Sequence, residues 1–223
     1  MLNELLTKAN LNEFPKDIVR LKSNIRSVDL SVNKLRSVPA FVGQFSCLRH
    51  LSLNNNRINE IAPEIGTLSK LETLSLNSNQ LVSLPSSISQ LKNLRNVSLS
   101  DNKLRSFPTV FCDLTHLDFL DLSRNNISEV PDGVKSLHVS ELNLNQNQVS
   151  VLSEELARCP RLKILRLEEN CIQLNVFPTK ILTDSQVSVL TIDGNLFEMK
   201  AFHNLQGYEQ YMERYTATKK KIT

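Results

Sequence analysis

Eight asparagines recur along the chain at an almost constant interval, and this spacing constrains the fold more than any other feature. The intervals are 23, 23, 23, 23, 22, 23 and 25 residues. The eight residues are Asn33, Asn56, Asn79, Asn102, Asn125, Asn147, Asn170 and Asn195. A fixed period of this length is typical of a tandem array, in which each repeat packs only on its neighbours. We therefore expect one elongated structural domain.

The apolar residues around each asparagine fall in one frame. The third repeat reads Leu71-x-x-Leu74-x-Leu76-x-x-Asn79-x-Leu81, which is the consensus of leucine-rich repeats. The frame divides residues 25–198 into eight coils, which start at Ile25, Leu48, Leu71, Leu94, Leu117, Val139, Leu162 and Val187. It predicts an α/β solenoid of horseshoe shape, with a concave parallel β-sheet and convex short helices or 3₁₀ turns.

Each coil alternates apolar and polar residues before its asparagine, which indicates a strand with one buried face. The first inward-facing positions are Val28, Leu51, Leu74, Val97, Leu120, Leu142, Leu165 and Leu190. The chain must turn after the strand, and its backbone N–H and C=O groups there face the inside of the coil. An asparagine side chain can satisfy both kinds of group, because it carries a donor and an acceptor. We call these eight residues the asparagine ladder and predict a structural role for them.

A second apolar pair follows each ladder asparagine and often precedes a proline, as at Pro39, Pro85, Pro108 and Pro131. Proline fixes φ and favours the first turn of a helical segment. Buried residues three apart then follow, as in Ile88, Leu91 and Leu94. This spacing predicts one or two turns of 3₁₀ or α-helix on the outer side.

Both ends of such an array need a cap. Residues 1–24 form a degenerate first coil, which can be aligned with the repeat in two ways. Counted back from Pro15, Ala9 takes the ladder position. Counted from Asn10, Leu2 and Leu5 fit the apolar positions, but the second half of the coil is displaced by one residue. Residues 199–216 are predicted to contain a capping helix, because Leu205, Tyr208, Tyr211, Met212 and Tyr215 recur at helical spacing from Asn204 to Thr216. Residues 217–223 form a basic tail, whose three lysines we interpret as solvated.

Composition excludes several classes of function. A net charge of +3 is too small to indicate nucleic acid as the main partner. No segment is long and apolar enough to cross a membrane, and the start of the chain carries no secretory signal. Cys47, Cys112, Cys159 and Cys171 lie in different repeats, so we interpret them as reduced structural thiols. We expect a cytoplasmic protein.

No arrangement of reactive residues indicates catalysis. The histidines lie in different coils or in the cap, and only His50 is predicted to point to the open face of the sheet. Cys159 and Cys171 have no histidine at metal-ligand spacing, and five glycines leave little material for a phosphate-binding loop. We predict that the protein is not an enzyme, has no catalytic or metal site and binds no cofactor.

The open face of the sheet is the better candidate for function. In coils two to four it carries Ser52, Ser75 and Ser98, which offer a partner little to hold. Coils five to eight combine apolar and charged residues, with six acids against three bases when the two residues before each ladder asparagine are included. The candidate partner-binding residues are Asp118, Phe119, Asp121, Arg124, Glu141, Asn143, Lys163, Ile164, Arg166 and Val189. An aromatic residue ringed by charge is typical of an interface hot spot, although Phe119 and Ile164 could instead simply cover each other.

Four stretches, Glu141–Val149, Cys159–Cys171, Gly194–Glu198 and Tyr211–Lys221, resemble a group of small intracellular leucine-rich-repeat proteins. The resemblance covers nearly the whole chain and implies an interaction protein without enzymatic activity. Such relatives tend to begin Met-Gly-Asn-Ser, a myristoylation start, whereas this chain has Leu2 at the position of the acylated glycine. Lipid anchoring is therefore not carried over, and membrane association would require a lipidated longer or alternative form.

These observations predict a non-enzymatic scaffold that binds a protein partner on its concave face. We expect a monomer that binds no nucleic acid. Two alternatives remain open, namely a regulatory subunit of a signalling enzyme in a phosphatase or small-GTPase pathway, and a peripheral membrane adaptor. The former would change the rate of its partner, and the latter would bind liposomes in a salt-dependent way.

Overall fold

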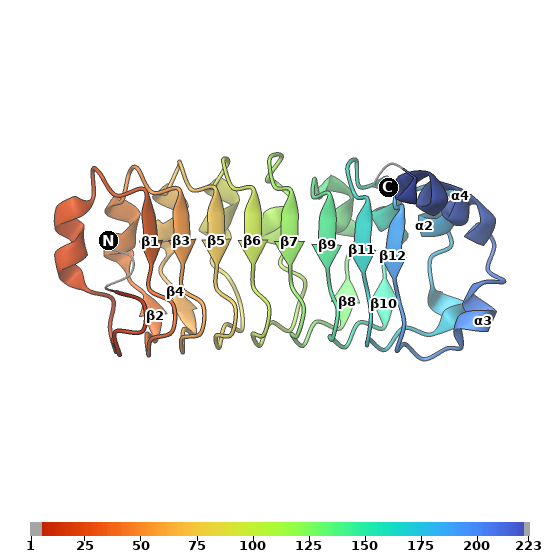
Figure 1. Ribbon diagram of the computed structural model, residues 1–223, viewed down its shortest axis with the longest axis horizontal. Coiled ribbons are helices and arrows are strands. Elements are labelled where there is room, and N and C mark those ends of the chain that lie inside the picture. Colours follow the sequence, from red (N-terminus) through yellow and green to blue (C-terminus); the bar gives the residue numbers. More distant parts are fainter. Residues whose placement is uncertain (1–5, 221–223) are drawn as a thin grey trace.

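The computed structural model describes residues 6–220 and confirms the predicted solenoid (Figure 1). One parallel sheet contains eight strands, with one strand from each coil. They are β1 (Ser27–Asp29), β3 (His50–Ser52), β5 (Thr73–Ser75), β6 (Asn96–Ser98), β7 (Phe119–Asp121), β9 (Glu141–Asn143), β11 (Ile164–Arg166) and β12 (Val189–Thr191). Each strand pairs with the strand of the next coil, so the order in the sheet follows the order in the sequence.

The register of the sheet places equivalent residues of successive coils side by side. Val28 is opposite Leu51, for example, and Leu51 is opposite Leu74. The first inward-facing positions are buried as predicted, except that Leu190 in the last strand is half-buried. A single column of aliphatic side chains therefore runs through the whole stack.

The asparagine ladder joins each coil to the one before it. Asn56 Oδ1 accepts the backbone N–H of Leu35 at 3.0 Å, and Asn56 Nδ2 donates to the carbonyls of Leu30 and Leu53, each at 3.0 Å. The same bonds to the preceding coil recur at all eight ladder residues, from Asn33 to Asn195. The predicted structural role of the ladder agrees with this geometry.

The residue before each ladder asparagine adopts a left-handed conformation. The φ angles are between 54° and 59° from Val32 to Glu169, and 76° at Gly194 in the last coil. Most side chains at this position are polar, and Val32 is the one β-branched residue among them. Left-handed φ is costly for valine, because its branched Cβ crowds the backbone.

The outer layer consists of short helical segments. They are η1 (Lys16–Leu21), η2 (Ala40–Gln44), η3 (Pro63–Thr67), η4 (Ser86–Gln90), η5 (Thr109–Phe111), η6 (Asp132–Ser136), η7 (Glu154–Arg158), η8 (Leu174–Val176) and α2 (Lys180–Thr183). Proline occupies the N-cap of five of them, as the sequence predicts. Before these segments, β2 (Ser37–Val38) pairs with β4 (Glu60–Ile61), and β8 (Glu129–Val130) pairs with β10 (Val151–Leu152).

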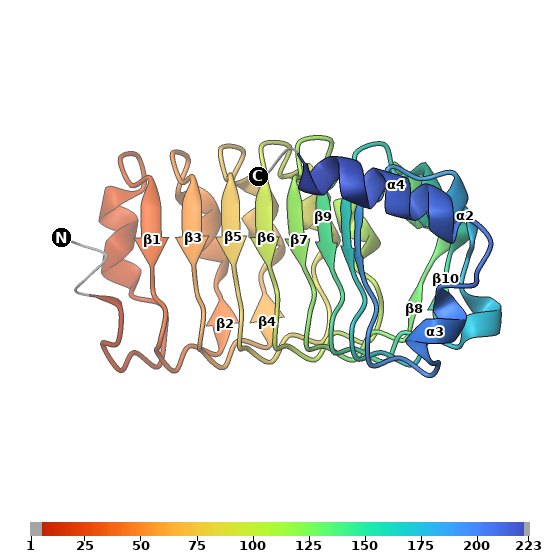
Figure 2. The same ribbon diagram turned by 45° about the vertical axis from the view of Figure 1, so that its right-hand side comes forward.

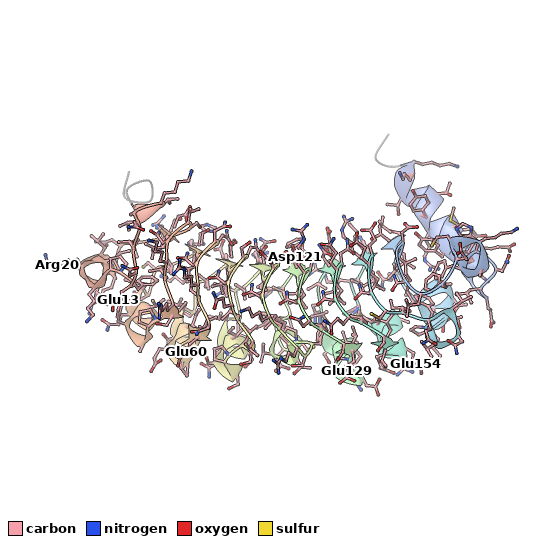
Figure 3. The ribbon with its side chains drawn as sticks, turned by 90° about the horizontal axis from the view of Figure 1, so that it is seen from below. Glu13, Arg20, Glu60, Asp121, Glu129 and Glu154 are labelled. Carbon is pink, nitrogen blue, oxygen red and sulfur yellow. The ribbon has the colours of Figure 1, made fainter. Side chains whose placement is uncertain are left out.

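The stack forms a shallow arc with the sheet on its inner side (Figure 3). Asp121 of the sheet lies on one side of the arc, whereas Glu60, Glu129 and Glu154 lie toward the other (Figure 3). The horseshoe is therefore an open one, and its concave face is accessible along its length.

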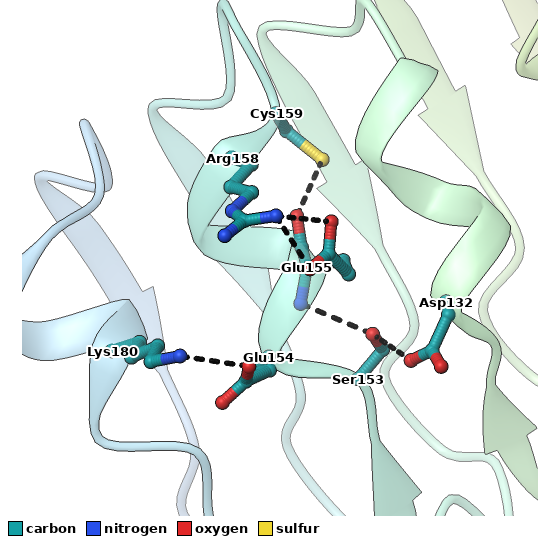
Figure 4. A network of polar contacts seen from close by, with 7 residues as sticks. All are labelled: Asp132, Ser153, Glu154, Glu155, Arg158, Cys159 and Lys180. Atoms are coloured by element: carbon teal, nitrogen blue, oxygen red, sulfur yellow. Dashed lines mark hydrogen bonds and ion pairs between the residues drawn. The ribbon is translucent and has the colours of Figure 1, made fainter.

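A polar network connects the outer segments η6, η7 and α2 (Figure 4). Ser153 Oγ donates to Asp132 Oδ1 of η6 at 2.6 Å and accepts the N–H of Glu155 at 3.1 Å, which caps η7. Lys180 Nζ of α2 contacts Glu154 Oε1 at 2.7 Å. Ser153 stands at the position of the proline in earlier coils. Its hydroxyl stabilises the start of the helical segment by a capping hydrogen bond, whereas proline stabilises that start by restricting φ.

The N-terminal coil follows the frame in which Ala9 takes the ladder position. Lys8 has the left-handed φ of 58° that precedes every ladder residue. Leu6 and Leu11 supply the carbonyl and the N–H that Asn33 binds. The alternative frame, in which Asn10 is the ladder residue, is therefore wrong. Leu2 and Leu5, on which that frame depended, lie outside the described residues.

The predicted C-terminal cap consists of two helices, α3 (Met199–Phe202) and α4 (Tyr208–Lys219), joined by a turn at Gly207 with φ of 91° (Figure 2). Helix α4 thus begins after Leu205 and extends into the segment predicted as a tail. Tyr211 Oη accepts the N–H of Leu190 at 3.1 Å, so it satisfies a backbone group at the edge of the sheet. Arg214 donates to the carbonyls of Val187 and Leu182, at 3.0 and 2.7 Å.

We expect Asn102→Leu to destabilise the fold by at least about 2 kcal/mol, because each buried backbone group that loses its partner costs about 1–3 kcal/mol. The N–H of Leu81 and the carbonyls of Leu76 and Leu99 all bond to this side chain. Urea unfolding followed by circular dichroism measures the change. Asn126→Ala is the matched control, because Asn126 is exposed; equal losses in the two variants would contradict the prediction.

We expect Val32→Asn to raise the free energy of unfolding by about 1 kcal/mol, because asparagine tolerates left-handed φ better than valine. Val32 is 42% exposed, so little buried surface is lost. Val82→Asn is the control, since Val82 is 47% exposed and has no positive φ. Thermal unfolding of both variants tests this expectation; no stabilisation of Val32→Asn, or an equal stabilisation of Val82→Asn, would contradict it.

Candidate functional site

The sheet arranges the candidate residues of coils five to eight in two rows. In the first row Phe119 is opposite Glu141, which is opposite Ile164, which in turn is opposite Val189. In the second row Asp121, Asn143 and Arg166 follow one another in the same way. Seven of the ten candidates therefore lie on adjacent strands. Asp118 and Lys163 precede their strands, and Arg124 follows in the turn beyond β7.

The three apolar candidates are half-buried rather than fully exposed. Neighbouring strands are about 4.8 Å apart, so side chains in one row cover part of each other's surface. Glu141 stands between Phe119 and Ile164 in this row. The apolar surface is thus divided by one carboxylate, and it continues from Ile164 to Val189 without interruption.

Two of the acidic candidates are paired with arginines. Glu141 Oε1 is 2.8 Å from Arg166 Nε, and these side chains are 23% and 35% exposed. Asp118 Oδ1 is 2.6 Å from Arg161 Nη2. Sequence reasoning missed Arg161, because it lies just before the start of its coil at Leu162 and therefore outside the strand positions that were compared.

Asp121 and Asn143 also hold the backbone. Asp121 Oδ1 accepts the N–H of Ser123 at 2.9 Å, and Asn143 Oδ1 accepts the N–H of Asn145 at 3.0 Å. These bonds fix the turn that leads from each strand to its ladder asparagine. Substituting Asp121 would therefore disturb the fold as well as the surface.

A hollow of about 440 Å³ lies beside these rows, where the strands end. Its lining residues are polar except for the last: Ser123, Arg124, Asn143, Asn145, Gln146, Glu168, Glu169, Asp193 and Gly194. Gln146 accepts from Arg124 Nε at 2.7 Å and donates to Glu169 Oε2 at 2.8 Å. The hollow thus contains three carboxylates and one guanidinium group, which favours cationic ligands. Arg124 and Asn143 of this lining were predicted as partner-binding residues from the sequence, whereas the three acids entered only the charge count of this face.

The first half of the open face is different. Ser52, Ser75 and Ser98 are half-buried, and His50 is exposed in β3. Arg49 pairs with Glu72 across neighbouring coils. In this half the row that continues Phe119 consists of Asn96, Thr73 and His50, none of them apolar.

In residues 6–220 no three His, Cys, Asp or Glu side chains are placed to hold a metal ion, and no helix is long and apolar enough to span a bilayer. Burial raises the pKa of the Cys112 thiol to about 11 and that of Cys159 to about 12, with smaller contributions from Asp113 and from Cys112 respectively. Both thiols are therefore protonated near neutral pH, as structural thiols are.

Comparisons with known proteins agree with the fold. A family model described as a leucine-rich repeat region matches residues 39–109, and the leucine-rich-repeat model matches residues 116–137. A leucine-rich-repeat protein of Leptospira interrogans is 29% identical and superposes with a TM-score of 0.61, covering 88% of this chain and 62% of that one. The fold is therefore that of the leucine-rich-repeat proteins.

Two receptors share the same fold at lower identity. A TDR receptor is 22% identical with a TM-score of 0.71, over 82% of this chain and 33% of that chain. The plant peptide hormone receptor RGFR1, solved in complex with RGF2, is 24% identical with a TM-score of 0.62, over 82% of this chain and 34% of that chain. The chain spans less than two thirds of the length of each of these structures.

We expect Cys112 and Cys159 to react with iodoacetamide much more slowly than Cys47 and Cys171 at pH 8. The thiolate is the nucleophile, and a pKa of about 11 leaves only about one thiol in a thousand ionised at that pH. Because burial raises both pKa values, their alkylation should accelerate as the pH rises. Mass spectrometry of alkylated peptides measures the rates, and alkylation in urea is the control. Fast native labelling of Cys159 would contradict the expectation.

Proposed function

We propose that the protein is a non-enzymatic scaffold that binds a protein segment on the open face of coils five to eight. The observation that carries the proposal is the row from Phe119 to Val189, which places half-buried apolar side chains beside a charged hollow. A partly covered apolar residue with a polar rim suits an interface, since hot-spot residues lie in desolvated pockets surrounded by polar contacts.

The charges on this face favour a partner segment with basic and apolar residues. Arg161 neutralises Asp118, and Arg166 neutralises Glu141. Four carboxylates remain: Asp121 accepts the N–H of Ser123, and Glu168, Glu169 and Asp193 line the hollow with Arg124. A basic side chain of the partner would enter this hollow while an apolar side chain rests on Ile164 and Val189. Complementary charge of this kind sets orientation and specificity more than affinity.

The wider family supports an interaction role, because the RGFR1 structure contains a bound partner. We further propose that the chain is a relative of leucine-rich repeat-containing protein 57, on the four stretches that resemble that group, and that it acts in the cytoplasm as a monomer. No feature of the concave face favours the alternatives of an enzyme-regulating subunit or a membrane adaptor over this role.

The double variant Phe119→Ala/Ile164→Ala tests the proposed face. We expect a peptide-display library to yield ligands rich in lysine, arginine and apolar residues, and the variant to bind them at least about 30-fold more weakly, the effect of losing a hot spot worth about 2 kcal/mol. Both residues are half-buried at the surface, so the fold should persist.

The matched control is His50→Ala/Thr73→Ala, which alters the same row of the sheet in coils two and three. Ligands selected on the wild-type protein should bind this control as they bind the wild type. A selection without basic residues, or equal losses in both variants, would refute the proposed site.

A further inference from the structure

A second charged surface lies where each coil turns away from its ladder asparagine. The first and third residues after the asparagine are cationic in much of the first half of the array. We call these cations the basic strip: Lys34, Arg36, Arg57, Lys103 and Arg105. At the same positions coils five to seven carry Asn126, Ser128, Gln148, Ser150, Cys171 and Gln173, none of them charged. The repeat thus supplies its own comparison, five positive charges against none.

Backbone hydrogen bonds hold the strip in alignment. The N–H of Arg57 donates to the carbonyl of Leu35 at 2.9 Å, and the N–H of Lys103 donates to that of Leu81 at 2.9 Å. Residues at this position are therefore stacked from coil to coil. Three coil spacings separate the ends of the strip, or roughly 15 Å at the strand spacing of a sheet.

All five cations are exposed, and none of them has an ion-pair partner within 4.0 Å among the described residues. On the open face, by contrast, Arg49, Arg161 and Arg166 are each paired. Unpaired like charges repel one another, and a bound anionic group would relieve that repulsion.

The strip is also hollowed. Arg36 and Arg57 line a depression of about 330 Å³ together with the amides of Asn59 and Gln80. Arg36 also lines an adjoining hollow of about 450 Å³, which contains Lys16 and Glu13. Guanidinium groups that converge on one depression suit carboxylates, which they bind in a bidentate geometry. Three exposed acids lie near the strip and would limit how far an acidic ligand extends: Glu13 in the adjoining hollow, and Glu60 and Asp101 within three residues of Arg57 and Lys103.

Val82 occupies the third position in the coil between Arg57 and Lys103, and it is 47% exposed. The strip therefore presents cations on both sides of one apolar side chain. Stable binding to an anionic bilayer needs a second membrane signal, which the strip itself lacks. Single-stranded nucleic acid needs exposed aromatic side chains on which bases stack, whereas Phe14 and Phe41 of the adjoining hollow are buried and half-buried and pack edge to face on each other.

We propose that the basic strip binds an acidic, extended protein segment in which carboxylates flank an apolar residue. The carboxylates pair with Arg36 and Arg57 on one side and with Lys103 and Arg105 on the other. The apolar residue rests on Val82. This surface is separate from the open face of coils five to eight and prefers the opposite charge, so the protein can join two different segments.

Fluorescence polarisation with a labelled peptide that alternates glutamate and valine tests the proposal at physiological salt. Arg57→Gln/Lys103→Gln removes two positive charges from the strip, and Gln148→Glu/Ser150→Glu changes the net charge equally on the same positions of later coils. We expect the first variant to bind at least about tenfold more weakly and the second to change affinity less than about twofold. Val82→Ser should weaken binding about threefold without any change of charge.

Several results would overturn the proposal. One is the absence of peptide binding. Another is an equal loss of affinity in both charge variants, which would mean that only the net charge of the protein attracts the peptide. Tighter binding to phosphatidylserine vesicles or to single-stranded DNA than to the peptide would assign the strip to another class of partner. Dimerisation that the first variant abolishes, measured by sedimentation, would assign it to the acidic face of a second copy. Phe119→Ala/Ile164→Ala should leave peptide binding unchanged, which separates this test from that of the concave face.

Discussion

The hydrogen bonds of the asparagine ladder are the constraint on which the rest of the structure depends. Each ladder side chain accepts from one coil and donates to two, so it fixes the distance and the register between neighbours in a single step. Because the bonds are made inside the stack, water cannot replace them, and their loss leaves buried polar groups unpaired. The apolar column supplies most of the free energy of folding, but it does not specify alignment. The ladder specifies this alignment, and the rows of surface residues are therefore aligned from coil to coil as well.

Alignment has a consequence for function. A residue type that recurs at one frame position becomes a continuous feature of the surface, whereas a change of type at a certain coil becomes a boundary. The open face changes character between Ser98 and Asp121, which are neighbours in one row. The basic strip ends between Arg105 and Ser128, at the equivalent point of the coil. Both boundaries therefore fall between coils four and five, so the two halves of one rigid array differ in charge on two different faces.

Much of the fold could be predicted from the sequence, because the frame states which side chains point inward. The coil starts, the buried positions and the turn-forming prolines follow from it directly. What the frame could not supply are contacts that leave the repeat. Arg161, just before the start of coil seven, reaches Asp118 at the start of coil five, and Tyr211 binds the backbone of Leu190 from a helix that has no counterpart in the coils. Likewise, the backbone conformation of Lys8 distinguishes the two possible frames of the N-terminal coil, and the spacing of residues alone does not determine that conformation.

The C-terminal end of the array shows why a cap has to differ from the repeat that it closes. An inner strand finds its partner in the next coil, but β12 has none beyond it, so its outer edge would expose unpaired backbone groups. Helix α4 meets this need with side chains: Tyr211 bonds to Leu190, and Arg214 bonds to carbonyls at Val187 and Leu182. Burial lowers the pKa of the Arg214 guanidinium and raises that of the Tyr211 hydroxyl. Because α4 also projects beyond the sheet on its open side (Figure 3), the same helix that ends the stack borders the open face at β12, where Tyr211 bonds to Leu190. The C-terminal half of the open face is therefore bounded, and a bounded surface is better suited than an open one to hold a short segment in one orientation.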